Sequence, residues 1–337
     1  MSTILPLKSK RDPAFDTMRA ILIFLVVFGH SLEYFRLENT PATFLYIFIY
    51  LFHMPVFVFI SGYFSKNIEK GRQTAVKTFL IPYLIFNLLL SIFMLLTGRI
   101  QEVMILNPGW TLWFLYCMFG WRILLPDLVK IRYVLFFSFI FGVLSGLLTE
   151  FGTYMAMART FGFLPYFLAG YFCQQEQIQK IRMFPFRRLI SLIIVSVALF
   201  VSYLWTKSNL PPELLWGDRA YGLFDTPLYQ TFLADLFLYL LSFSFIFVFL
   251  TLTSQKRFFF TSWGQHTLSI YLLHIYLIAP LIEATEKIKN PALHFLLLLL
   301  GSLITTYLLS LPIVSHQLSK ILNKIVQIIM PEKSKEK

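Results

Sequence analysis

Charged residues are scarce in this sequence. Asp, Glu, Lys and Arg make up only 14% of its 337 residues, against roughly 25% in a typical soluble domain. Its two cysteines, Cys117 and Cys173, lie among apolar neighbours without metal-ligand spacing, so we interpret them as buried thiols and expect no disulfide scaffold or metal site. Phosphate-binding glycine loops, dinucleotide fingerprints, zinc motifs and nucleophile elbows are also missing. Hydrophobic residues instead make up 57% of the chain, and its mean hydropathy of +0.70 indicates a membrane protein.

Ten apolar segments, mostly of about 20 residues as a bilayer-spanning helix requires, predict an all-α, polytopic membrane helical bundle. They lie near 18–34, 42–65, 75–97, 110–125, 131–149, 155–173, 188–205, 228–253, 264–283 and 293–315. The connections are short except for 206–227. We therefore expect one membrane domain at 18–315, between an N-terminal tail at 1–17 and a C-terminal tail at 316–337. No small-residue cleavage site follows Phe28, so we expect the first segment to be retained and not removed as a signal peptide.

Lys and Arg residues gather on one side of the alternating connections, which holds 22 of the 29. The opposite side holds Arg36, Arg99, Arg159, Lys207, Arg219, Lys287 and Lys289. Basic residues concentrate in the cytoplasmic loops of membrane proteins, so this bias predicts that both termini are cytoplasmic. The same bias explains the net charge of +12 better than nucleic-acid binding does.

The first apolar segment carries titratable residues on one helical face. Arg19 and His30 are eleven residues apart, which offsets their side chains by only about 20° around a helix and separates them by roughly 16 Å along it. Asp16 lies three residues before Arg19, within reach of an ion pair. Charged groups normally face a protein interior or a watery cavity inside a membrane, so this stripe predicts a functional site. The structural alternatives are a snorkelling anchor at Arg19 and a helix-bridging contact at His30.

Further polar and aromatic residues lie inside or at the ends of the expected spans. The candidates for a cavity or an acceptor site are His53, Trp110, Trp113, Arg159, Asp235, Ser269 and His274. Pro55 should free the carbonyl near residue 51 and kink the second span beside His53, either as a packing kink or as part of the cavity. Asp235 is expected to contact an imidazole or a substrate hydroxyl, or else to pair with Arg159. The two tryptophans alternatively belong to an interfacial aromatic belt, and Ser269 and His274 lie on nearby but separate helix faces.

Several phrases, in order along nearly the whole chain, resemble one family of membrane enzymes. The first is the Arg19-to-His30 spacing preceded by Asp16. It is followed by HMPVFVFISGYF at 53–64, GWTLWFL at 109–115, FLPYFLAGY at 163–171 and HTLSIYLLH at 266–274. Together they resemble acyltransferase family 3, integral membrane O-acyltransferases, and its fucose 4-O-acetylase-like branch. Many relatives carry closely spaced arginines before the proline of the third span, whereas KGRQTAVKTFLIP stands here at 70–82.

The resemblance implies transfer of an acyl group, acetyl by analogy with the branch, from cytoplasmic acyl-CoA to a hydroxyl of a cell-surface or lipid-linked glycan. It also implies a multi-pass protein of the bacterial plasma membrane, with acetyl-CoA as co-substrate and no tightly bound cofactor. His30 would accept the proton of the acceptor hydroxyl, since an imidazole titrates near pH ~6.5. Arg19, Arg72 and Lys77 would attract the CoA phosphates. Asp16 would pair with Arg19 at the cytoplasmic mouth, because about 20 Å of helix separates it from His30.

Two alternatives remain open in the sequence. Within acyl transfer, the acceptor either attacks the thioester directly or takes the acyl group from an acyl-histidine intermediate. The competing function is a proton-coupled transporter or flippase for an envelope precursor, because buried His and Asp residues form proton relays and Pro-interrupted spans suit substrate cavities. No clear inverted repeat supports transport. A non-catalytic membrane protein would tolerate changes at His30.

Overall fold

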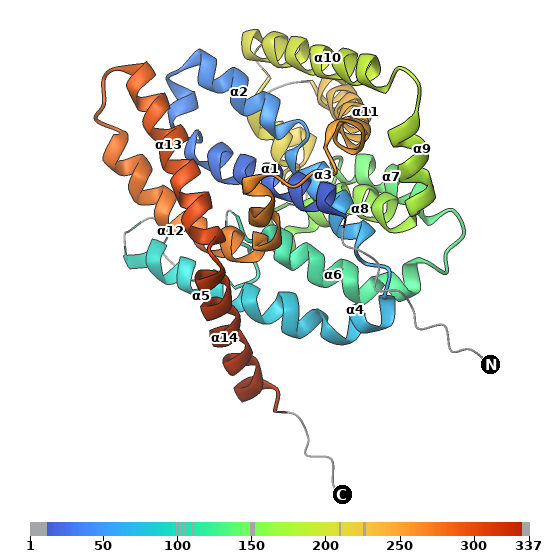
Figure 1. Ribbon diagram of the computed structural model, residues 1–337. Coiled ribbons are helices and arrows are strands. Elements are labelled where there is room, and N and C mark those ends of the chain that lie inside the picture. Colours follow the sequence, from blue (N-terminus) through green and yellow to red (C-terminus); the bar gives the residue numbers. More distant parts are fainter. Residues whose placement is uncertain are drawn as a thin grey trace, which may run out of the picture.

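The structure, a computed structural model, describes residues 12–331 apart from 97, 99, 101, 102, 104, 110, 149–151, 209, 225 and 226. Within these residues the regular secondary structure is helical, and they contain no strand (Figure 1). Seven helical stretches of the described chain are long and apolar enough to cross a bilayer. They are Pro13–Ser31 (α1), Thr40–Tyr63 (α2 and α3), Ile68–Leu96 (α4 to α5), Arg187–Lys207 (α10), Leu228–Leu252 (α11), Thr267–Thr285 (α12) and Pro291–Ser310 (α13). The predicted polytopic helical membrane bundle is confirmed.

The other three predicted segments form shorter helices. They are Trp113–Leu128 (α6), Val134–Ser145 (α7) and Met157–Phe172 (α8), with 16, 12 and 16 residues. At 1.5 Å per residue such helices reach about 18–24 Å, less than the roughly 30 Å of a hydrocarbon core. Each of the ten predicted segments therefore contains a helix, although these three are too short to cross a bilayer of that thickness unaided.

Helix α1 begins at Pro13, five residues before the predicted start of the first span. The Asp12 carboxylate caps it by accepting a hydrogen bond from the backbone N–H of Ala14 (2.9 Å), and Pro13 occupies the first helical position, where no N–H is needed. Hydropathy placed this turn outside the membrane because it carries Asp16. The carboxylate of Asp16 is instead buried by neighbouring segments.

The third span contains a π turn. Helix α4 (Ile68–Ala75) continues through the π turn Val76–Leu80 into α5 (Ile81–Leu96). The extra residue of a π turn rotates the helix that follows it. In α5 this orientation directs Tyr83 to the Ile105 carbonyl (2.6 Å) and the Asn87 side chain to the Gly109 N–H (2.7 Å), which fastens the connection before α6.

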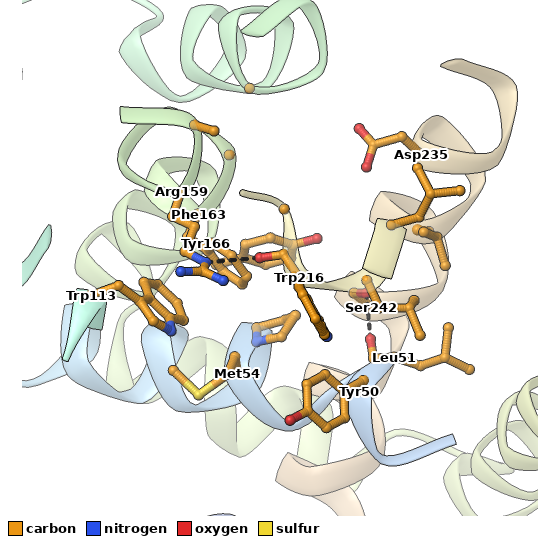
Figure 2. Close-up of a pocket in the computed structure, with 18 of the residues that line it drawn as sticks. Tyr50, Leu51, Met54, Trp113, Arg159, Phe163, Tyr166, Trp216, Asp235 and Ser242 are labelled. Atoms are coloured by element: carbon orange, nitrogen blue, oxygen red, sulfur yellow. Dashed lines mark hydrogen bonds between the residues drawn. The ribbon is translucent and has the colours of Figure 1, made fainter. Parts of the chain in front are cut away.

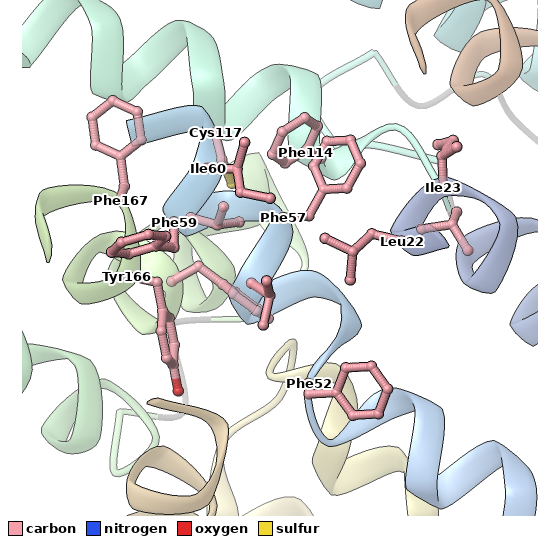
Figure 3. Packing of buried hydrophobic residues seen from close by; sticks show 14 of the residues in the cluster. Leu22, Ile23, Phe52, Phe57, Phe59, Ile60, Phe114, Cys117, Tyr166 and Phe167 are labelled. Carbon is pink, nitrogen blue, oxygen red and sulfur yellow. The ribbon is translucent and has the colours of Figure 1, made fainter. Parts of the chain in front are cut away.

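Helix α1 lies at the centre of the bundle. It packs against α2, α3, α12, α13 and the 3₁₀ helix η6 (Phe259–Gln265), and 72% of its apolar window is buried. Figure 3 shows α1 beside α3, which in turn packs against α8 and contacts α6 through the rings of Phe57 and Phe114. Only 22% and 28% of the corresponding windows of α10 and α13 are buried, so their apolar faces are left for lipid. Both cysteines are free thiols; Cys117 is buried in the core as predicted, whereas Cys173 is only half-buried.

The connections predicted for the two sides of the membrane gather at opposite ends of the bundle. At the predicted cytoplasmic end, Arg182 of α9 (Gln175–Met183) pairs with Asp12 (2.8 Å), and Lys66 donates to the Cys173 carbonyl (2.6 Å). At the other end, Arg36 forms an ion pair with Glu213 (2.9 Å). Two backbone hydrogen bonds also lie there, from the Met155 N–H to the Leu106 carbonyl (2.8 Å) and from the Tyr221 N–H to the Gly146 carbonyl (2.6 Å). These contacts support the predicted alternation of the segments. Helix α14 (Pro312–Ile329) extends away from the bundle (Figure 1).

Two glycines allow α3 and α8 to touch. A Cβ on Gly62 would lie 1.9 Å from the Phe167 carbonyl oxygen, and one on Gly170 would lie 1.9 Å from that of Phe59. Small residues at such crossings let two helix backbones approach closely in membrane proteins. The contact is reciprocal, so neither helix can take up a side chain without moving the other.

We therefore expect Gly62→Ala and Gly170→Ala each to lower the melting temperature of the purified protein by several degrees, because the backbones must separate. Gly120→Ala in α6 is the control, since a Cβ there meets nothing within 4 Å. Alanine also favours a helix by roughly 1 kcal/mol over glycine, so the control should be neutral or stabilising. Thermal unfolding in detergent measures all three; equal melting temperatures would contradict the close α3–α8 contact.

Candidate functional site

A cavity of about 120 Å³ lies among α1, α3, α7, α8, α11 and the connection that precedes α11. This is the volume of about four liquid water molecules, or of a small acyl group. Of the predicted site residues, His30, His53, Trp113, Arg159 and Asp235 line it. Trp110 lies outside the described residues. Five side chains scattered over more than 200 residues of sequence are thus brought together around one space.

A break between α2 (Thr40–Tyr50) and α3 (His53–Tyr63) shapes one wall of the cavity. Pro55 has no N–H to donate to the carbonyl four residues before it, and the freed Leu51 oxygen accepts a hydrogen bond from Ser242 Oγ of α11 (2.5 Å; Figure 2). The predicted free carbonyl at residue 51 is confirmed. Its partner Ser242 was not predicted, because nothing in the sequence pairs α3 with α11.

His53 is the first residue of α3, and its tautomer is fixed. Its Nδ1 lies 2.9 Å from the Ile49 carbonyl, and a carbonyl only accepts, so Nδ1 carries the proton and Nε2 keeps its lone pair. The ring of Tyr50 packs edge-on against it, with centroids 4.7 Å apart. The cavity wall therefore contains a neutral imidazole that can accept a hydrogen bond at Nε2.

A second imidazole lies next to His30. The ring of His274 on α12 stacks on that of His30 near the end of α1, with centroids 5.4 Å apart and planes inclined by 28°. His274 Nδ1 donates to the Tyr271 carbonyl (2.8 Å), so its lone pair is on Nε2, which is buried without a hydrogen-bond partner in the described chain. His274 does not line the cavity but lies behind His30. Ser269 is also outside the cavity and donates to the Leu309 carbonyl (2.9 Å), which joins α12 to α13.

Arg159 and Asp235 face the cavity from different helices, and the alternative that they form an ion pair is wrong. Figure 2 shows them on separate walls, Arg159 on α8 and Asp235 on α11. Arg159 donates from Nε to the Trp216 carbonyl (3.0 Å) and from Nη2 to Asp218 (3.1 Å). Asp235 accepts from the Tyr221 hydroxyl (2.6 Å). Burial and the Asp235 charge raise the pKa of Tyr221, so the phenol stays protonated as the donor.

These partners lie on one segment, the outer loop (residues 210–224), which contains the 3₁₀ helices η4 (Pro212–Trp216) and η5 (Tyr221–Leu223). Side chains near the start of the chain hold it over the cavity. Trp216 Nε1 donates to the Tyr46 hydroxyl (2.7 Å), which donates to Glu33 (2.7 Å). Arg36 bridges Glu33 (3.0 Å) and Glu213 (2.9 Å). The outer loop is therefore fixed by a continuous polar network.

Sequence reasoning missed the outer loop as part of the site. Several of its residues line the cavity, among them Trp216, Gly217, Arg219 and Tyr221. Asp218 on the same loop pairs with the Arg159 guanidinium of the cavity. The available signal was that 206–227 is the one long connection between predicted spans and is rich in charged and aromatic residues. That composition did not show that the loop folds back into the bundle.

The predicted donor residues lie at the other end of α1. Asp16 and Arg19 form the ion pair expected from their spacing, and Gln265 of η6 donates to the second Asp16 oxygen (3.0 Å). The Arg19 guanidinium lies over the ring of Phe64, 5.4 Å from its centroid. Neither Asp16 nor Arg19 lines the cavity, whose walls reach only as far as Val26 on α1.

Arg72 and Lys77 belong to the same end of the bundle but not to the cavity lining. Arg72 on α4 pairs with Asp127 of α6 (3.1 Å), which also accepts from Lys130 (2.9 Å). Both partners of the first pair are about half exposed, so solvent screens their attraction and the pair contributes little to stability. Lys77 is half-buried within the π turn.

Imidazoles, a guanidinium and a carboxylate around an intramembrane cavity mark a functional site of a membrane protein. Comparison with protein families identifies the family to which the chain belongs. A family model described as an acyltransferase domain, acyltransferase family 3, matches residues 12–311. The chain therefore belongs to this family of membrane acyltransferases, which favours acyl transfer over transport.

Two curated relatives share part of the sequence. The nodulation protein NolL of Mesorhizobium japonicum is 39% identical over 85 residues, which is 23% of each chain. The nodulation protein NolL of Sinorhizobium fredii is 45% identical over 62 residues, 18% of this chain and 17% of its own. The matched part is thus about a quarter or less of either relative. No solved structure matches the chain.

The polar network over the cavity predicts how the outer loop responds to the loss of one contact. In Glu213→Gln the Arg36–Glu213 ion pair is lost while side-chain length is kept, so the outer loop should open more often. Trypsin should then cleave several-fold faster after Arg219, which is half-exposed on this loop. Glu283→Gln near the end of α12 is the control, because Glu283 is exposed and lies in no ion pair of the described chain. Equal cleavage rates would show that Arg36 does not hold the loop.

Proposed function

We propose that this protein transfers an acyl group, acetyl in the first instance, from cytoplasmic acyl-CoA to a hydroxyl of a cell-surface or lipid-linked glycan. The proposal places it in the bacterial plasma membrane. Membership of the acyltransferase family supports the reaction class. The single observation that carries the proposal is that His30 lines one cavity together with His53, Arg159 and Asp235 near one end of α1, while Arg19 lies toward the other end.

His30 is the proposed general base. The acceptor hydroxyl would give its proton to the imidazole as its oxygen forms a bond to the thioester carbonyl carbon. Collapse of the tetrahedral intermediate would break the carbon–sulfur bond, and the CoA thiolate would take the proton from the imidazolium. Such proton transfer contributes typically 10²–10⁴-fold to a rate.

His274 supports this role by its position. Its ring packs on that of His30, and its Nδ1–H is held by its own helix. Packing of this kind limits the orientations open to the His30 ring, and a fixed base loses less entropy on reaching the reactive geometry. We therefore assign His274 as a positioning residue and not as a group that contacts substrate.

The cavity suits a sugar ring as acceptor. Trp113, Trp216 and Tyr166 present aromatic surfaces, and Asp235 and Tyr221 provide polar contacts among them. Aromatic rings cover the apolar face of a sugar, while a carboxylate accepts hydrogen bonds from its hydroxyls. His53 Nε2 adds a further acceptor in the part of the wall formed by α3.

Arg159 supplies positive charge to the same space. Two of its nitrogens are bound to the outer loop, and Nη1 makes no hydrogen bond in the described chain. It therefore has a donor left for the thioester carbonyl oxygen, where negative charge develops during acyl transfer. The stacked Trp113 ring, 5.1 Å from the guanidinium carbon, holds the side chain in place.

The thioester arm would approach from the predicted cytoplasmic end. Arg19 lies roughly 16 Å from His30 along α1, so the acyl group has to travel about half the hydrocarbon thickness. Packed side chains fill this stretch, since Ile23, Val26 and Val27 of α1 are buried. Donor binding therefore requires neighbouring helices to part beside α1.

Replacement of His30 tests the proposal directly. In His30→Ala, acetylation of the envelope glycan should fall at least about 100-fold, the effect of losing a general base. His316→Ala on the exposed side of α14 is the matched control and should acetylate normally. Mass spectrometry of glycans from the two strains, together with protein levels in the membrane, measures both. Normal acetylation in His30→Ala would rule out this base, and solute transport without acetyl-CoA consumption would support a transporter instead.

The two chemical routes differ in what stays on the enzyme. Direct attack needs no second base, because no acyl-enzyme has to be broken down. It predicts that no label remains on the protein after it is mixed with radiolabelled acetyl-CoA in the absence of acceptor. Single-turnover samples quenched in denaturant at neutral pH and passed at once through a desalting column provide the measurement, because an acyl-imidazole hydrolyses in acid. Label that appears on wild type and disappears in His30→Gln would establish the acyl-histidine route.

A further inference from the structure

Arg122 on α6 lies against the backbone of α4. A Cβ on the buried Gly71 would lie 2.7 Å from Arg122 Nη1 and 3.4 Å from its Cδ. The guanidinium therefore occupies the space that a side chain at position 71 would need. Figure 1 shows α4 and α6 side by side at this end of the bundle.

No anion among the described residues accounts for the position of the Arg122 guanidinium. Arg122 makes no ion pair in the described residues, and its Nε is buried without a hydrogen-bond partner there. The carboxylate on the same helix, Asp127, is taken by Arg72 (3.1 Å) and Lys130 (2.9 Å). A partly desolvated cation without a counter-charge costs free energy, so the site favours binding of an external anion.

Other cations lie on the elements that pack against α6. Arg72 directly follows Gly71, and the π turn with Lys77 also packs against α6. The acids on α4 and α6 are Glu69 and the half-exposed Asp127, against the cations Lys70, Arg72, Lys77 and Arg122. The region therefore keeps a net positive charge on the predicted cytoplasmic side.

We propose that Arg122 is a phosphate-binding residue at the donor end of the enzyme, with Arg72 and Lys77 beside it. The inference rests on the proposed CoA donor. A guanidinium presents a planar fork that binds two phosphate oxygens at once, which a lysine cannot do. The nucleotide part of CoA carries several phosphate charges and must stay near the cytoplasm while its thioester arm extends toward His30. An anionic lipid headgroup offers the same phosphate chemistry from a different source.

The test measures CoA binding to the purified full-length protein in detergent. In Arg122→Gln, CoA should bind about tenfold more weakly or worse, the size of one charge-assisted contact, and its affinity should depend less steeply on salt. Arg122→Lys should recover part of the loss, and Gly71→Ala should weaken binding because the new methyl displaces the guanidinium. Binding of S-acetylpantetheine, which lacks phosphate, should be unchanged in each variant. Arg132→Gln, an exposed arginine before α7, is the control for surface charge.

Each contrary result has one meaning. Wild-type CoA affinity in Arg122→Gln overturns the phosphate assignment and leaves the proposed function intact. Equal losses for CoA and S-acetylpantetheine show a structural role instead. Loss of co-purifying phosphatidylglycerol in Arg122→Gln, with CoA binding unchanged, identifies a lipid headgroup as the ligand. If wild type binds neither CoA nor S-acetylpantetheine, the proposed donor itself is wrong and this assignment falls with it.

Discussion

The need to keep polar groups out of lipid determines how this bundle is arranged. Helix α1 carries Asp16, Arg19 and His30, and each is far more costly in hydrocarbon than in a protein interior. Enclosure of α1 by α2, α3, α12 and α13 removes that cost and makes it the most buried of the long helices described. The outer helices can then be almost wholly apolar, because they have only to separate α1 from lipid.

The same constraint explains the hydrogen bonds between distant segments. The Leu51 carbonyl, released by Pro55, takes its hydrogen bond from Ser242 on another helix because no water is available in a bilayer core. The Arg159 guanidinium likewise takes its partners from the outer loop, which has to fold inward to supply them. The cavity is therefore surrounded by groups that also hold the fold together, so stability and the shape of the site depend on the same contacts.

Periodicity and hydropathy were enough to predict what depends on local sequence: the helical segments, their alternation and the Asp16–Arg19 pair. They also predicted the free carbonyl at residue 51, since proline acts on a fixed position four residues before it. They failed where partners come from far along the chain, as for Arg159 with Asp218, and where a polar turn such as the first of α1 is buried by tertiary packing. Arg122 was counted only as a cytoplasmic charge, because its contact with Gly71 depends on how α4 meets α6. That His30, His53 and Asp235 lie around one cavity could not be predicted from sequence, because it depends on how the helices pack in three dimensions.

The π turn at Val76–Leu80 has a consequence for the way insertions and deletions act in this protein. Deleting one of its five residues would restore ordinary α geometry and turn the whole of α5 by about 100° relative to α4. Tyr83 and Asn87 would then face lipid, and the connection they fasten before α6 would be released. A deletion far from the cavity would thus release the segment that leads into Trp113 at the start of α6. The π turn therefore affects one wall of the cavity through α5 and α6, although it does not line the cavity itself.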